Sequence, residues 1–133
     1  MTVLIDTNVI IDIATDDADW SEWSLAQRRA ADLRGGAVIN DVIFAELCFP
    51  YDSPDDVEEL MSLLDLSIRP FRKESLFLAA KAFEAYKLAG GQKSNVLPDF
   101  FIGAQAAVEG LPLLTRDPKR YRSYFPQVEI IAP

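Results

Sequence analysis

The sequence contains no histidine and only one cysteine, Cys48, among its 133 residues. The lack of histidine excludes Ser-His-Asp and Cys-His catalytic sets, histidine-based zinc sites and histidine general acid–base pairs. A single cysteine excludes an intrachain disulfide and a zinc site built from several thiolates. Any hydrolytic chemistry must therefore depend on carboxylates, on a bound cation, or on both.

Positive charge is also scarce, because 13 Lys and Arg residues stand against 21 Asp and Glu residues, for a formal net charge of −8. This balance argues against broad electrostatic attraction to nucleic acid, but it leaves room for a local basic rim. No apolar run reaches the roughly 18 residues that span a bilayer, and the N-terminus lacks the basic region of a signal peptide. We therefore expect a cytoplasmic protein without a membrane segment, folded as one domain over 1–133.

Short apolar runs alternate with segments of helical periodicity. The predicted strands are 3–5, 37–39, 66–71, 111–115 and 128–131. The predicted helices are 9–14, 20–33, 57–64, 74–89 and 98–108, with another that begins after a cap at Asn40 or Asp41 and a polar loop at 90–96. The apolar stripes of 20–33 and 74–89 include Leu33 and Leu76. This alternation predicts an α/β fold with a mainly parallel, roughly five-stranded sheet, covered on both faces, with functional sites at the carboxyl ends of its strands.

Four acids occupy positions that such a sheet would bring together. They are Asp6 after the first strand, Glu46 in the helix after the second, Asp99 at the start of a late helix, and Asp117 after the fourth strand. Taken singly, Asp6 and Asp117 can be helix caps, Asp99 a first-turn acid and Glu46 part of a solvated face. Taken together, carboxylates about 4 Å apart would repel by about 4 kcal/mol per pair at an effective dielectric constant of about 20. A converged cluster therefore requires a counter-charge, which a divalent cation supplies.

The chemistry of the ligands indicates which cation to expect. Carboxylate oxygens without histidine or thiolate select a hard ion, Mg²⁺ or Mn²⁺, over zinc. Two such ions can activate a water and stabilise the leaving oxygen in phosphodiester cleavage. Thr7, Asn8 and Thr115 lie beside the acids and could orient ligands or water, although ordinary turn and capping roles are the alternative.

Four motifs in a fixed order carry a resemblance to a known family: D-T-N at 6–8, A-E at 45–46, P-D-F-F-I-G-A-Q-A at 98–106 and L-L-T-R-D at 113–117. Together they resemble the PIN-domain ribonucleases, specifically the VapC-type toxins, over nearly the whole chain. The resemblance implies a three-layer α/β/α sandwich and an acidic metal site formed by Asp6, Glu46, Asp99 and Asp117 with support from Thr115. It also implies Mg²⁺- or Mn²⁺-dependent endonucleolytic cleavage of RNA, homodimerisation, and neutralisation by a VapB-type antitoxin.

Basic residues near the acids are candidates for RNA binding despite the negative net charge. They are Lys93, Arg116, Lys119 and Arg120, with Arg116 the leading candidate for a phosphate contact. The alternative is that each is a solubilising surface charge.

Three other functions remain open at this point. A PIN-like fold could act as a non-catalytic binding module that keeps its acids for capping. A haloacid-dehalogenase-like phosphatase also has an Asp after its first strand, but it requires a second Asp where this chain has Asn8. A phospho-receiver domain requires an acceptor Asp at the end of a middle strand, and the segment 66–71 has none.

Overall fold

The computed structural model describes residues 1–93 and 95–133, and within them five strands form one parallel sheet in the order β3-β2-β1-β4-β5. The strands are β1 (Val3–Ile5), β2 (Ala37–Ile39), β3 (Leu66–Ile68), β4 (Leu113–Leu114) and β5 (Ile130–Ile131). The central strand β1 is buried along its whole length, and its Leu4 is aligned with Val38 of β2 and Leu113 of β4. A continuous apolar run suits this position, because helices cover both faces of a parallel sheet.

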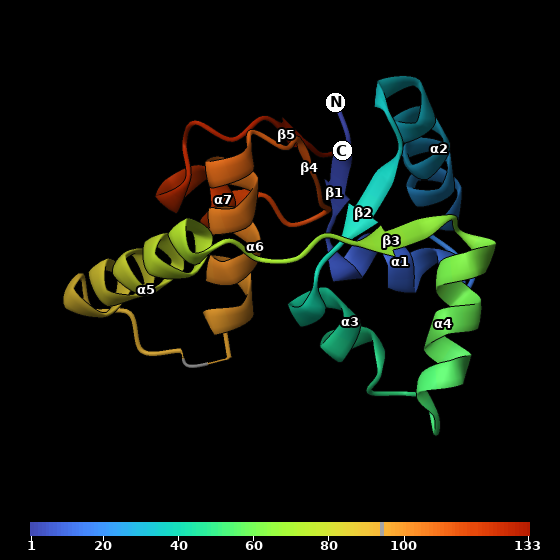
Figure 1. Ribbon diagram of the computed structural model, residues 1–133, viewed down its shortest axis with the longest axis horizontal. Coiled ribbons are helices and arrows are strands. Elements are labelled where there is room, and N and C mark those ends of the chain that lie inside the picture. The colour runs from blue at the N-terminus through green and yellow to red at the C-terminus, as the bar shows by residue number, and fades with distance from the viewer. Residues whose placement is uncertain (94) are drawn as a thin grey trace.

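Helices form the two outer layers. They are α1 (Thr7–Ala14), α2 (Ser21–Ala31), α3 (Asp41–Leu47), α4 (Pro54–Leu63), α5 (Lys73–Leu88), α6 (Leu97–Glu109) and α7 (Lys119–Tyr124), with a 3-10 turn at Asp32–Arg34. In Figure 1, α5, α6 and α7 lie to the left of the sheet, and α2 and α4 lie to its right. The predicted α/β/α sandwich with a five-stranded parallel sheet is therefore confirmed. None of the helices in the described part of the chain combines the length and the apolar composition that a bilayer crossing requires.

Side-chain caps fix the helices that follow the central strands. The carboxylate of Asp6 accepts a hydrogen bond from the Thr7 backbone N–H at the start of α1, and Asn40 Oδ1 accepts from the Ile43 N–H in α3. Both helices begin below the carboxyl ends of their strands in Figure 1. The Asn40 amide also donates to Gln105 Oε1 on α6 at 2.9 Å, and both side chains are fully buried. This bond ties α3 to α6 directly beneath the edge of the sheet where the predicted site lies.

The structure differs from the predicted elements mainly at their ends. The third strand stops at Ile68 and does not reach 71, because Pro70 lacks the N–H that would continue the ladder. The helix predicted at 20–33 ends at Ala31, and the tighter turn that follows leaves Leu33 92% exposed. Leu76 also lies on the exposed side of α5. The predicted loop 90–96 includes Ser94, which lies outside the described residues.

Gly103 marks the closest packing between α6 and the C-terminal segment. A Cβ atom at this position would overlap the ring of Phe125, which is fully buried. We expect Gly103→Ala to lower the free energy of unfolding by about 1–3 kcal/mol, because overpacking forces the ring or the helix to shift. Urea denaturation followed by circular dichroism measures this loss.

The double variant Gly103→Ala, Phe125→Leu is the control, since a smaller side chain at 125 leaves room for the added methyl group. Its loss of stability should be smaller than the sum of the two single losses. Additive losses would show that the two positions are not in steric conflict.

Candidate active site

One pocket of about 240 Å³ collects the four predicted acids from four separate segments of the chain. Asp6 follows β1, Glu46 lies on α3, Asp99 lies in the first turn of α6, and Asp117 follows β4. The residues around the pocket are Asp6, Thr7, Asn8, Ile11, Glu46, Asp99, Asp117 and Tyr121. The pocket is therefore at the carboxyl edge of the sheet, where parallel α/β folds place their sites.

Asp6 is the most enclosed of the four acids, with 6% of the residue exposed. Its Oδ1 accepts from the Thr7 N–H at 2.8 Å, and its Oδ2 accepts from the hydroxyls of Thr115 at 2.8 Å and Tyr121 at 3.0 Å. Burial is the main cause that raises the pKa of Asp6 from 3.8 to about 6, and the nearby charge of Asp99 adds to it. Three hydrogen bonds oppose this rise without cancelling it. The folded protein therefore holds the negative charge of Asp6 at a cost.

Glu46 and Asp99 face the same pocket and are held by different donors. The Thr7 hydroxyl donates to Glu46 Oε1 at 2.6 Å, and the Arg120 guanidinium donates to Asp99 Oδ2 at 2.6 Å. Burial raises the pKa of Glu46, with the Thr7 hydrogen bond opposing. Burial also raises the pKa of Asp99, while the hydrogen bond and the charge of Arg120 lower it. All three shifts have the same direction, so a cation in the pocket would relieve each of them.

Thr115 connects the two loops that border the pocket. Its fully buried hydroxyl donates to Asp6 and accepts from the Asn8 amide at 3.3 Å and from the Asp117 N–H at 3.1 Å. Thr7, Asn8 and Thr115 therefore all contact predicted acids or each other, as orienting residues would. Asp117 is exposed and does not cap α7, because Pro118 takes the N-cap position. The capping explanation of Asp117 is wrong for this reason.

Three of the four predicted basic residues gather beside the acids. Lys93, Lys119 and Arg120 surround a second cavity of about 340 Å³, which also includes Asp117. Because Asp117 borders both cavities, the basic cavity adjoins the acidic pocket.

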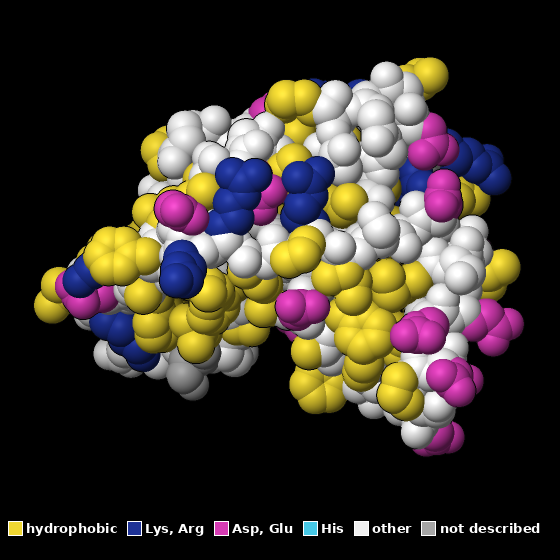
Figure 2. Space-filling model, in the orientation of Figure 1, with side chains coloured by type: hydrophobic (Ala, Val, Ile, Leu, Met, Phe, Trp, Pro, Cys, Tyr) yellow, Lys and Arg dark blue, Asp and Glu magenta, His cyan; other side chains and the backbone are white. Residues whose placement is uncertain are grey.

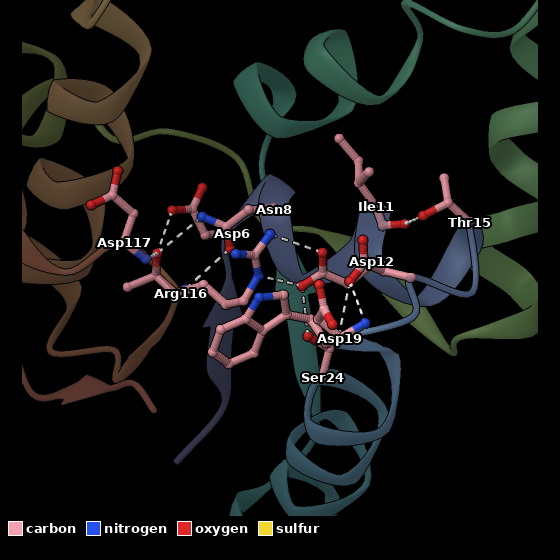
Figure 3. A network of polar contacts seen from close by, with 12 residues as sticks. Asp6, Asn8, Ile11, Asp12, Thr15, Asp19, Ser24, Arg116 and Asp117 are labelled. Atoms are coloured by element: carbon pink, nitrogen blue, oxygen red, sulfur yellow. Dashed lines mark hydrogen bonds and ion pairs between the residues drawn. The ribbon is translucent and has the colours of Figure 1, made fainter.

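The fourth predicted basic residue, Arg116, is paired with an acid outside the acidic pocket. Its Nε and Nη2 donate to the two carboxylate oxygens of Asp12 at 2.5 and 2.9 Å, and its guanidinium lies 5.0 Å from the centre of the Trp20 ring. Asp12 is buried in α1 and also accepts from the Ser24 hydroxyl on α2 (Figure 3). The Arg116 backbone N–H donates to Asn8 Oδ1. Arg116 thus anchors the loop after β4 to α1, and RNA contact by its side chain stays a prediction.

Sequence reasoning missed Tyr121 and Asp12. The Tyr121 hydroxyl lies 3.0 Å from Asp6 Oδ2 and 3.5 Å from Asp99 Oδ1, so it bridges two acids from different segments. Burial raises the pKa of Tyr121 well above its usual range, which keeps this hydroxyl a donor. Its position four residues after Asp117, in the first turn of the helix that follows, was an available signal. The corresponding signal for Asp12 was that it is the only charge in the apolar stretch 9–14.

The chemistry of the pocket fits a hard divalent cation, because every polar side chain around it offers oxygen or amide groups. Among the described residues, no three acidic or cysteine side chains stand close enough together to form a ready metal-binding group. Mg²⁺ is usually held by one or two carboxylates and keeps several waters. The arrangement therefore suits a partly hydrated ion on the pocket wall better than an ion enclosed by protein ligands.

The raised pKa of Asp6 predicts how stability depends on pH without metal. Between about pH 4 and 6 the unfolded chain has already lost the Asp6 proton while the folded chain keeps it, so stability falls as the pH rises. The pKa of Asp6 rises from 3.8 to about 6. At about 1.4 kcal/mol per pKa unit, this lowers the free energy of unfolding by about 3 kcal/mol across that pH range. We expect Asp6→Asn to flatten this slope in urea denaturation series with chelator present. An unchanged slope would show that Asp6 titrates normally.

The ion pair between Arg116 and Asp12 predicts a large structural effect. Arg116→Ala would leave the buried Asp12 carboxylate without its cation, and we expect a loss of about 3 kcal/mol in the free energy of unfolding. Arg122→Ala, an exposed arginine on α7, is the matched control and should change stability by less than about 0.5 kcal/mol. Equal stabilities of the two variants would contradict the anchoring role.

Comparisons with known proteins identify the family and the fold. The family model of the PIN domain matches residues 3–126. The search of curated proteins found no match. Among solved structures, the fold is similar to VapBC from Salmonella typhimurium bound to DNA, with 14% identity, a TM-score of 0.72, and coverage of 99% of this chain and 98% of that chain.

Two further structures show the same likeness. VapBC2 from Rickettsia felis, bound to a promoter DNA fragment, has 17% identity and a TM-score of 0.71 over 99% of this chain and 98% of that chain. FitAcB from Neisseria gonorrhoeae has 22% identity and a TM-score of 0.67, over 98% of this chain and 96% of that chain. At these identities the structures show a shared fold, while the family model spans nearly all of the sequence. The family resemblance inferred from the motifs is confirmed, and the chain belongs to the PIN-domain family.

Proposed function

We propose that this protein is a Mg²⁺- or Mn²⁺-dependent endoribonuclease that acts as the toxin of a toxin-antitoxin pair. One observation carries the proposal: Asp6, Glu46, Asp99 and Asp117 come from four separate segments and line a single pocket at the carboxyl edge of the sheet. Capping alone does not explain this convergence, since burial raises the pKa of three of the four. Because the chain belongs to the PIN-domain family, it is neither a haloacid-dehalogenase phosphatase nor a phospho-receiver domain.

The residues of the pocket have different roles in the proposed hydrolysis. Asp6 and Asp99 would hold the cation, and Asp117 on the open side of the pocket would add a further ligand or orient a water. Bound divalent ions supply Lewis-acid activation of water and stabilisation of the leaving oxygen. Glu46 Oε1 is engaged by Thr7, so Oε2 is left to accept the proton of the attacking water. Thr115 positions Asp6 and the backbone of Asp117, and Asn8 donates a hydrogen bond to Thr115.

RNA reaches this pocket through a local basic surface. Lys93, Lys119 and Arg120 surround the adjoining cavity, where phosphates of the strand can bind next to the acids. Because the net charge of the protein is −8, the rest of its surface attracts RNA only weakly. The resemblance of the motifs to VapC-type ribonucleases supports RNA as the substrate, and we propose that the protein acts in the cytoplasm.

A VapB-type antitoxin is the proposed partner, and the toxin itself is proposed to be a homodimer. Solved structures that share this fold include a toxin-antitoxin complex from Klebsiella pneumoniae. An apolar groove of about 560 Å³ lies between α3 and the start of α6, with Val42, Ala45, Phe49, Leu97 and Pro98 around it, and Glu46 borders both this groove and the acidic pocket. Figure 2 shows the molecule hollowed at its lower edge, where this groove lies. An apolar antitoxin segment that ends in a basic residue would fit both the groove and the acids beside it.

Amide variants of the central acids test the proposed function. Asp6→Asn and Asp99→Asn should each lower RNA cleavage in Mg²⁺ or Mn²⁺ by at least about a hundredfold, and chelator should abolish cleavage by the wild type. Asp41→Asn, at an exposed acid in the first turn of α3, is the matched control and should cleave normally. Cleavage is followed on a labelled RNA by gel electrophoresis.

Thermal unfolding gives a readout that does not depend on finding the right RNA. Mn²⁺ should raise the midpoint temperature of unfolding of the wild type and of Asp41→Asn. The rise should be much smaller for Asp6→Asn. A wild type that neither gains stability from Mn²⁺ nor cleaves RNA would favour a non-catalytic binding module instead.

A further inference from the structure

Arg120 stands at the boundary between the acidic pocket and the basic cavity. Its Nη1 donates to Asp99 Oδ2 at 2.6 Å, and the two side chains are 25% and 31% exposed. Arg120 also borders the basic cavity, together with Lys93, Lys119 and Ser123. One arginine therefore has access to a carboxylate on one side and to a phosphate-sized cavity on the other.

The contact with Asp99 occupies an oxygen that a metal ion would need. A carboxylate oxygen accepts about two hydrogen bonds, and Asp6 Oδ2 already accepts from Thr115 and Tyr121. Asp99 Oδ2 accepts from Arg120 in the same pocket. Acceptor positions on Asp6 Oδ2 and Asp99 Oδ2 are thus already occupied, and a cation bound at Asp99 would sit next to a guanidinium of the same sign. Like charges at that distance repel strongly in a partly buried site.

We propose that Arg120 exchanges partners during the functional cycle. Without a divalent cation it is the counter-charge of Asp99, and when a cation binds there its side chain turns into the basic cavity and binds a phosphate of the RNA. A planar guanidinium suits both partners, because it donates paired hydrogen bonds to carboxylates and to phosphates alike. Arg120 already borders the basic cavity and contacts Asp99 of the acidic pocket, so the exchange we propose requires a movement of its side chain alone.

This exchange couples the two ligands. The cation releases Arg120 for the RNA, and RNA that holds Arg120 frees Asp99 for the cation, so each strengthens the binding of the other by the same factor. In the absence of RNA, Arg120 competes with the cation and weakens its binding. These consequences rest on the proposed nuclease function, but the competition can be measured with the metal alone.

The first test is Mn²⁺ binding to the full-length, metal-free protein without RNA, measured by electron paramagnetic resonance of free Mn²⁺. Arg120→Ala and Arg120→Gln should each bind Mn²⁺ at least about fivefold more tightly than the wild type. Lys119→Ala is the matched control, since Lys119 borders the same basic cavity but, among the described residues, forms no ion pair with the acids of the pocket, whereas Arg120 is paired with Asp99. Its Mn²⁺ affinity should stay within about twofold of the wild type. Circular dichroism establishes that each variant is folded.

The second test measures binding of a fluorescent single-stranded RNA with Ca²⁺ as the cation. Ca²⁺ should tighten RNA binding by the wild type and by Lys119→Ala, and the tightening should be smaller in both Arg120 variants.

If the Arg120 variants bind Mn²⁺ no more tightly than the wild type does, the exchange is overturned. If the wild type also cleaves RNA, the nuclease proposal is left intact. A wild type that binds no Mn²⁺ and cleaves no RNA would instead overturn the proposed function itself.

Discussion

Burial of negative charge at the carboxyl edge of the sheet is the constraint on which the rest of the site depends. Asp6 is nearly enclosed at the end of the central strand, with Asp99 close enough to raise its pKa further. Ionised carboxylates in such a place need donors, cations or both. The hydroxyls of Thr115 and Tyr121 and the guanidinium of Arg120 are what this chain provides. A divalent cation in the pocket would offset the same negative charge, and the oxygen-rich lining fits such an ion.

The scaffold holds these charges in place through buried polar contacts away from the pocket. The bond between Asn40 and Gln105 joins the helices that carry Glu46 and Asp99, so two acids distant in sequence keep a fixed separation. On the other side, the pair of Arg116 and Asp12 fixes the loop that carries Asp117. Both contacts link segments that carry acids of the pocket, and they add to the pairing of the strands.

Local patterns in the sequence were sufficient for the sheet and for the four acids. Apolar runs that end in Asp6 or Asn40 mark strand ends, and a lone Glu46 in an apolar stretch marks a residue with a special environment. The partner of each charge was not predictable in this way. Arg116 and Arg120 are four residues apart in one basic segment, yet one binds Asp12 and the other Asp99. Arg116 lies in the loop after β4 and Arg120 lies on α7, and only the folded chain determines which acid each one meets.

The most direct measurement is anomalous X-ray scattering from crystals of the metal-free protein soaked in Mn²⁺ at neutral pH. The account predicts a single strong peak or a close pair of peaks in the acidic pocket, within ligand distance of Asp6 and Asp99, with Arg120 turned away from Asp99. An acidic pocket without Mn²⁺ at saturating concentration, with Arg120 still bound to Asp99, would contradict it.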